Sequence, residues 1–300
     1  EYLFFNPKLG INYLINNSMN AYILMTYTRR EPNMSALYNA SESFMGTKPN
    51  FEMRLDENGD PLYNFNNPLT KPESMFDLEL GYNWKTDLFN FNANAYLMQY
   101  KDELVNSGQL DVFGVPVMGN APKTQHIGLE LALNANLIKS NYGNIDLNAN
   151  ATFSRNRILD YNYYIDNENY ISLKDNPIAG FPDVLANFTL TYSIKNFYFS
   201  FSSNYVGESR TDNFGDLLTQ NQLLKASLGN GYYADNVLDP YFIANLDVSY
   251  TFKDIFGIRS LTLQGKINNL FNKLYAGGGQ GKEFFPGAER NGFLGVEIGL

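Results

Sequence analysis

Apolar and polar residues alternate along long stretches of the chain. In the clearest stretch, Phe89, Phe91 and Ala93 fall on one face of an extended strand. Asn90 and Asn92 fall on the other face. A period of two residues indicates a β-strand with one apolar and one polar face. The pattern predicts eleven strands, over residues 7–15, 19–30, 73–84, 88–101, 123–138, 144–157, 182–194, 196–206, 240–252, 259–272 and 290–300.

The lengths of the strands and of their connections narrow the fold class. The predicted strands run 9 to 16 residues, whereas strands of soluble proteins are usually about 5 to 6 residues long. Short turns alternate with long loops, a layout typical of outer-membrane barrels with periplasmic turns and extracellular loops. The short turns are 16–18, 85–87, 139–143, 195 and 253–257, and the long loops are 31–72, 102–122, 159–181, 207–239 and 273–289.

The predicted fold class is therefore an all-β membrane protein, an antiparallel up-and-down transmembrane β-barrel. Backbone amides in lipid must all be paired, and a closed ring of strands achieves this. Rows of Asn, Ser, Thr, Asp and Glu on the second face suit a wall that faces water or a polar plug. A soluble β-sandwich is the alternative, because its strands also alternate. It predicts a chain that stays in solution without detergent.

Composition argues against several other classes. The chain has 31 Asp and Glu against 22 Lys and Arg, which argues against a nucleic-acid partner. It contains no cysteine, so thiolate catalysis and Cys-ligated zinc are excluded. No uncharged apolar run approaches the roughly 18 to 20 residues of a transmembrane helix. We find no nucleophile elbow, phosphate-binding glycine loop or metal triad, and we expect no enzyme activity, cofactor or metal site.

The number of strands predicts that more of the barrel exists elsewhere. Single-chain bacterial barrels have even strand counts, with both termini on the periplasmic side. If the last strand runs to a periplasmic end, the first of eleven also runs downward. We therefore expect the C-terminal half of a barrel of about 22 strands. No signal peptide stands at Glu1, so we expect the sequence to be mature or to begin inside a longer chain.

Several segments carry a resemblance to a known family. The most specific is Asn-Asn-Leu-Phe-Asn-Lys-Leu-Tyr at 268–275, and the others lie at 7–13, 30–33, 72–82, 100–105, 126–130 and the terminal strand. Together they make the chain resemble the C-terminal part of a TonB-dependent outer-membrane receptor, of the kind abundant in Bacteroidetes. The resemblance implies a 22-stranded barrel and an N-terminal plug that bears a TonB box. The chain departs from the family in ending at Leu300, where such barrels usually end in an aromatic residue.

The resemblance also implies a function and a location. It implies a receptor in the outer membrane of a Gram-negative bacterium, for TonB-energised uptake of a scarce nutrient. The implied partners are outer-membrane lipid, the N-terminal half of the barrel, the plug, the TonB complex through that plug, and a small nutrient ligand. A ferric siderophore is the leading ligand, ahead of cobalamin or an oligosaccharide. The alternative of another class is a passive porin or a surface adhesin.

Aromatic residues in the long loops are the candidate ligand contacts. Stacking surfaces beside Asn and Asp donors and acceptors suit a planar or sugar-like ligand. The alternative is that these rings pack on one another or form the interfacial girdle of the barrel. The candidates are Tyr38, Phe44, Tyr63, Phe113, Tyr163, Tyr164, Tyr232, Tyr233 and Phe284.

Three other features have plainer interpretations. His126 is the only histidine, which excludes a two-histidine metal site, and we expect it to be a polar residue of the lumen wall or of a loop base. Residues 56–60 resemble a calcium loop but lack the EF-hand spacing, and Asn58-Gly59 predicts a hairpin turn. Asp77 and Glu79 form no convincing acid and base pair. We expect them to bond to Arg, Lys or the plug.

Overall fold

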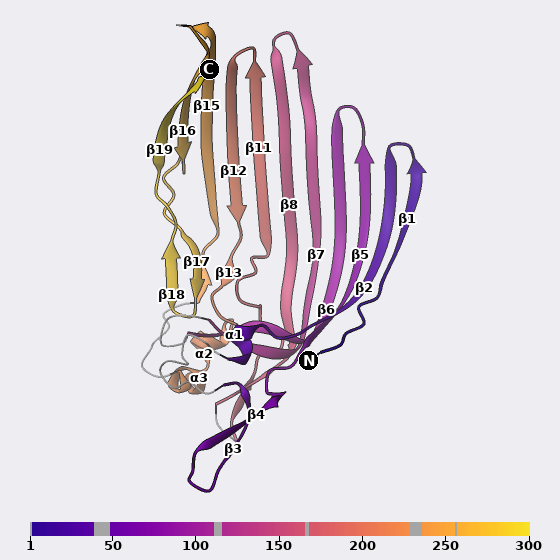
Figure 1. Cartoon of the computed structure of the whole chain (residues 1–300), viewed down its shortest axis with the longest axis vertical. Helices are drawn as coiled ribbons and strands as arrows, with labels where there is room; N and C mark the ends of the chain where they lie inside the picture. The colour runs from indigo at the N-terminus through magenta and orange to yellow at the C-terminus, as the bar shows by residue number, and fades with distance from the viewer. Residues whose placement is uncertain (1, 39–48, 111–115, 166–167, 229–235, 256) are drawn as a thin grey trace.

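The computed structural model describes residues 2–38, 49–110, 116–165, 168–228, 236–255 and 257–300. Its main feature is one sheet of eleven strands in which sequence neighbours pair antiparallel (Figure 1). These strands are β1 (Lys8–Asn16), β2 (Met19–Arg30), β5 (Glu73–Lys85), β6 (Phe89–Leu110), β7 (Pro116–Ser140), β8 (Gly143–Asp160), β11 (Val184–Ile194), β12 (Phe197–Val206), β15 (Tyr241–Ile255), β16 (Ile258–Asn268) and β19 (Asn291–Gly299). The all-β, up-and-down fold predicted from the alternation is confirmed.

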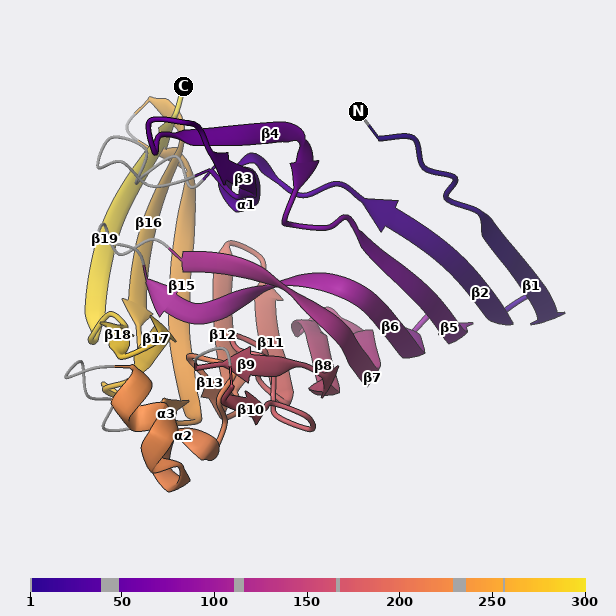
Figure 2. The same ribbon diagram turned by 90° about the horizontal axis from the view of Figure 1, so that it is seen from below.

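The sheet is curved and open, as Figure 2 shows. Its edges are β1 and β19, each paired along one side only. Nearly every residue of both edge strands is exposed. The described residues therefore form part of a barrel wall.

The two faces of the sheet differ as the alternation predicts. Ala95 on β6 pairs with Leu129 on β7, which in turn pairs with Phe153 on β8. Leu129 and Phe153 are 38% and 47% exposed, so this face is apolar and uncovered. On the other face, Asn94 pairs with Glu130. An apolar outer face and a polar inner face are the arrangement of a membrane barrel.

On the polar face, side chains reach across more than one strand. Tyr22 on β2 donates from its hydroxyl to Asn94 Oδ1 at 3.3 Å, although Gly81 on β5 lies between them in the register. A Cβ on Gly81 would stand 2.0 Å from the Tyr22 ring. Glycine at this position therefore lets the tyrosine lie flat on the wall.

The long connections gather at one end of the sheet and carry their own secondary structure (Figure 1). The Asn58-Gly59 turn is confirmed, since β3 and β4 form a hairpin around it. Asp56 Oδ1 accepts the backbone N–H of Asn58 and of Asp60, both at 2.8 Å, which closes that turn. The elements in these connections are α1 (Met34–Leu37), β3 (Phe51–Leu55), β4 (Pro61–Pro68), β9 (Asn162–Tyr164), β10 (Tyr170–Ser172), β13 (Ser209–Arg210), α2 (Leu217–Gln220), α3 (Gln222–Ser227), β14 (Val237–Leu238), β17 (Ala276–Gln280) and β18 (Glu283–Pro286).

Two predicted boundaries differ most from the structure. Most of the predicted loop 102–122 is strand, because β6 and β7 go on pairing beyond Lys101. Asp102 there adopts a left-handed φ of 55°, which disturbs the alternation that marks a strand. The strand predicted over 259–272 ends at Asn268, because Asn269 and Asn272 are left-handed, with φ of 51° and 50°. Within the described residues, no helix has the length and apolar character needed to cross a bilayer.

Candidate functional site

The long connections pack into a cap, which we define as the described residues of 159–183 and 207–240 together with the described distal part of the β6–β7 hairpin. Its centre is an apolar core that unites three connections. Phe214 comes from the connection after β12, Leu173 from the one after β8, and Ala121 from β7. Each is at most 1% exposed. Among the described residues, most of the largest fully buried apolar side chains therefore lie in the cap, and Ile158 joins them from the adjoining end of β8.

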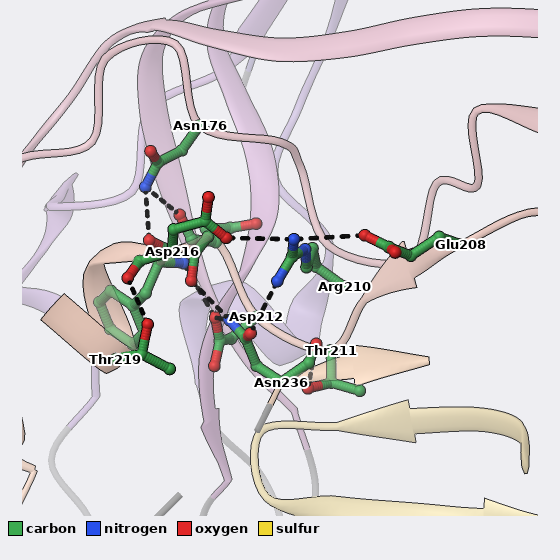
Figure 3. Close-up of polar contacts among 11 residues, drawn as sticks. Asn176, Glu208, Arg210, Thr211, Asp212, Asp216, Thr219 and Asn236 are labelled. Atoms are coloured by element: carbon green, nitrogen blue, oxygen red, sulfur yellow. Dashed lines mark hydrogen bonds and ion pairs between the residues drawn. The ribbon is translucent and has the colours of Figure 1, made fainter. Parts of the chain in front are cut away.

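Hydrogen bonds around Asp212 and Asn236, which we call the polar node, hold the connection between β12 and β15 in place (Figure 3). Asp212 Oδ1 accepts from the side-chain amide of Asn236 at 2.6 Å and from the backbone N–H of Phe214 at 2.9 Å. The same amide of Asn236 donates to the Gly215 carbonyl at 3.2 Å. Gly215 has a φ of 56°, a conformation that suits glycine. The node closes a loop of more than twenty residues at its base.

Neighbouring residues tie the node to other connections. Thr211 donates from its hydroxyl to the Gly281 carbonyl at 2.6 Å, which joins the node to the β17–β18 hairpin. The Asn176 amide donates to the carbonyls of Asn213 and Phe214 at 3.0 and 2.8 Å, which joins it to the connection after β8. Three long connections therefore share one polar anchor.

Burial raises the pKa of Asp212 to about 6, although the bonds from Asn236 and Phe214 and the charge of Arg210 act in the opposite direction. Asp212 is fully buried, and its Oδ2 has no hydrogen-bond partner. Ionisation of this carboxyl is therefore unfavourable in the folded cap.

A polar cavity of about 390 Å³ lies beside the node. Arg210 spans it and contacts the carboxylates of Glu208 and Asp216, both at 3.2 Å. On another side the cavity is lined by Arg157 from β8. The Nε of Arg157 is buried and has no partner among the described residues.

The β6–β7 hairpin crosses the open end of the curved sheet, where β6 contacts β17 (Figure 2). Asn120 on β7 fastens it to the first long connection, because its Oδ1 accepts from the Lys71 N–H at 2.8 Å and its amide donates to the Lys71 carbonyl at 3.0 Å. The hairpin therefore narrows the mouth of this half of the wall.

Below the hairpin, the only histidine joins a buried polar cluster on the inner wall, as expected. His126 contacts Glu103 through Nε2 at 3.1 Å and Asn156 through Nδ1 at 2.8 Å. The Thr124 hydroxyl donates to the same glutamate. The Phe181 ring packs edge-on against the imidazole, with centroids 5.1 Å apart.

The cluster borders a second cavity, of about 470 Å³, on the inner wall. Glu79 and Glu130 lie at its acidic side, and the Asn94 amide donates to them at 3.3 and 3.4 Å. Asp77 lies near Glu79, buried, with its Oδ1 unpaired among the described residues. This inner wall therefore presents an excess of negative charge.

The described candidate aromatics fall in separate places. Tyr38 packs on Phe51, with ring centroids 5.0 Å apart, and Tyr63 packs on Phe65 at 6.1 Å. Tyr163 packs against Phe214 in the cap core at 5.1 Å. These contacts are those expected of rings that pack on one another.

Two described candidates line cavities, and one is exposed. Tyr63 borders a cavity of about 570 Å³ along the β3–β4 hairpin, and Phe284 borders one of about 460 Å³. Tyr164 packs at a tilt against Tyr170 and is 65% exposed. Four candidates lie outside the described residues, namely Phe44, Phe113, Tyr232 and Tyr233.

The cavity at Phe284 also contains two rings that the sequence analysis did not select. Tyr241 and Tyr275 lie 4.5 Å apart and both line it. Tyr275 rests on Gly287, where a Cβ would stand 2.0 Å from the ring. The sequence contained a signal for one of these rings, because Tyr275 is the last residue of the specific 268–275 motif.

Asn269 fixes the motif that leads to Tyr275. Its Oδ1 accepts the Lys273 N–H at 2.9 Å, and its amide donates to the Lys273 and Ala288 carbonyls at 2.8 and 3.0 Å. Over the described part of the chain, no three His, Asp or Glu side chains are grouped to hold a metal ion.

Solved structures of similar fold are receptors and transporters. The ferric-catecholate import receptor Fiu of E. coli K12 has a TM-score of 0.60 at 16% identity over 96% of this chain and 34% of its own. The siderophore receptor PiuA of Acinetobacter baumannii has 0.64 at 15% identity over 96% and 35%. The FrpB iron transporter of Neisseria meningitidis has 0.63 at 19% identity over 97% and 38%.

The chain spans about a third of the length of these structures, which at such identities show the fold alone. No curated protein matches the sequence. The model of the family "TonB dependent receptor-like, beta-barrel" matches residues 1–270, nearly the whole chain. The open sheet with its polar inner wall thus belongs to the β-barrel family of TonB-dependent receptors.

Proposed function

We propose that this chain is the C-terminal half of the barrel of an outer-membrane receptor that takes up a scarce nutrient by TonB-energised transport. Barrels of this family are outer-membrane proteins of Gram-negative bacteria, and family membership is the observation that carries the proposal. A ferric siderophore is the leading ligand class, supported by the siderophore and iron receptors of similar fold. The likeness to receptors abundant in Bacteroidetes stays a prediction.

The cap and the other long connections at the same end of the sheet are proposed as the extracellular, ligand-capturing end. Long loops are extracellular in barrels of this type. The cavity lined by Phe284, Tyr241 and Tyr275 offers closely packed rings beside Asp239 and Lys273. Such a site suits a planar or sugar-like group. We therefore place first ligand contact at Phe284 and, in the β3–β4 hairpin, at Tyr63.

The acidic inner wall is proposed as the surface that faces the plug. Asp77, Glu79 and Glu130 carry more negative charge than the nearby Lys8 balances. Arg or Lys side chains of a plug would neutralise it. Force from the TonB complex would reach the ligand through that plug.

Uptake by the intact receptor tests the proposal. A strain that lacks the receptor should lose growth under iron limitation and uptake of radiolabelled ferric siderophore, and a plasmid copy should restore both. A protonophore should abolish the restored uptake, because the transport is energised. Uptake that persists with the protonophore would instead support the passive porin.

Parallel uptake experiments with other nutrients distinguish between the ligand classes. Cobalamin and a labelled oligosaccharide are offered to the same strains. Restored uptake of either one, without uptake of any ferric siderophore, would keep the transport mechanism and overturn the ligand class.

A further inference from the structure

Four cations lie together on the outer face of the sheet, at the end where the cap begins. Lys101 on β6 and Lys123 on β7 are direct partners in the register. Arg155 and Arg157 follow on β8, opposite Ile127 and Gln125 of β7. We call Lys101, Lys123, Arg155 and Arg157 the basic rim. In a chain with a net charge of −9, such a group is unexpected.

The register places the basic rim on the lipid side of the wall. Lys101 and Lys123 share a face with Leu97 and Ile127, which pair with each other four residues nearer the short turns. Arg155 follows Phe153 by two residues, so the two side chains point the same way. Ile127 and Phe153 are 46% and 47% exposed and belong to the apolar face.

Arg155 lies at the height of the headgroup layer, and Lys101 and Lys123 lie farther from the apolar band. Apolar positions of β8 run from Ile145 to Phe153, roughly 27 Å along the strand, close to the apolar band of about 25 Å in such barrels. Arg155 stands about 7 Å farther along the strand. Phosphate groups of the lipid occupy the layer directly outside the hydrocarbon.

The cations of the rim are not held in ion pairs within the described part of the chain, although Asp160 is the register partner of Lys123. None of its four cations forms an ion pair there, and Arg157 also has a buried Nε without a partner. Carboxylates lie near Arg157, since Glu208, Asp216, Asp175 and Asp183 line the same cavity. Glu208 and Asp216 are already held by Arg210.

We propose that the basic rim binds the phosphate groups of a phosphorylated lipid in the outer leaflet. Guanidinium groups bind phosphate oxygens in pairs, and lysines supply additional positive charge. Basic clusters at the membrane boundary attract anionic headgroups. The apolar face next to the rim receives the acyl chains of the same lipid, which distinguishes a lipid from free phosphate. The proposal goes beyond the transport function and needs only the membrane placement of the sheet.

The test measures lipid bound to the complete purified receptor in detergent. Native mass spectrometry follows titration with phosphatidic acid, with phosphatidylcholine of the same acyl chains, and with inorganic phosphate. The variant carries Lys101→Gln, Lys123→Gln, Arg155→Gln and Arg157→Gln. Its affinity for phosphatidic acid should fall by about tenfold or more, with little change for phosphatidylcholine.

A charge-preserving variant shows whether folding is responsible. Lys101→Arg, Lys123→Arg, Arg155→Lys and Arg157→Lys keep four cations and should retain most of the phosphatidic acid binding. The proposal is overturned if the glutamine variant binds phosphatidic acid within twofold of the wild type. It is equally overturned if inorganic phosphate binds as tightly as the lipid, or if the charge-preserving variant loses binding as fully as the glutamine variant.

Discussion

The side-chain amide of Asn236 donates to Asp212 Oδ1 at 2.6 Å, and this bond joins the two ends of the connection between β12 and β15. The donor and the acceptor are both fully enclosed by the cap. The second carboxylate oxygen of Asp212 has no partner among the described residues. Asp212 is therefore hydrogen-bonded through one carboxylate oxygen and unpaired at the other. We expect the stability of the cap to depend on the protonation of this carboxyl group.

The first prediction concerns the stability of the cap against pH. The pKa of Asp212 is about 6 in the folded cap against an ordinary 3.8. Folding therefore favours the protonated form, and the cap loses up to roughly 3 kcal/mol as the pH rises from about 4 to about 7. Asp212→Asn should remove this dependence. A cap that is more stable at pH 7 than at pH 5 would contradict the sign.

The measurement uses the absence of cysteine in this chain. A single cysteine at Leu223, which is 65% exposed on α3, accepts a fluorescent label without disturbing the core. Urea unfolding of the labelled cap in the complete receptor is then compared at pH 5 and pH 7. Asp216→Asn is the matched control, because Asp216 is a mostly exposed carboxylate of the same connection.

The strands could be predicted from the sequence because their environment repeats. Each residue of β6 from Phe89 to Leu97 faces either lipid or the lumen, so the side chains alternate and the register follows. The short turns at the opposite end follow for the same reason, since strands of one membrane have similar lengths.

The cap could not be predicted in the same way. Leu173, Phe214 and Ala121 meet in one core but come from three connections with no shared period. Asp212 and Asn236 are 24 residues apart, and no pattern links an aspartate to that particular asparagine. The aromatic rings were visible in the sequence, but which of them would pack and which would line a cavity depends on these distant contacts.

The second prediction tests the cap core. Phe214→Ala removes a fully buried ring and should lower the stability of the cap by about 3 to 5 kcal/mol. In intact cells, protease should then cleave the connection between β12 and β15 faster while the strands stay protected. Leu223→Ala changes an exposed side chain of the same connection and should have little effect.

The third prediction concerns the rings of the Phe284 cavity. Gly287→Ala places a methyl group 2.0 Å from the Tyr275 ring, which must shift and so disturbs its packing on Tyr241. If these rings contact the ligand, uptake should fall several-fold with the amount of receptor in the membrane unchanged. Gly277→Ala is the control, because its added carbon would lie 3.6 Å from the same ring, an ordinary contact. Equal uptake by the two variants would exclude the cavity as a ligand site.

The last prediction concerns the acidic inner wall. Glu79 and Glu130 both accept from the Asn94 amide, so their two charges are held close together on the lumen side. If a basic surface of the plug neutralises them, the double substitution Glu79→Gln and Glu130→Gln should weaken the contact between the plug and the barrel wall. Cells carrying this receptor should then become more sensitive to large antibiotics that the outer membrane normally excludes. Glu57→Gln, which removes an exposed carboxylate in the turn between β3 and β4, away from the inner wall, should leave sensitivity unchanged. If both variants match the wild type, the two glutamates do not hold the plug.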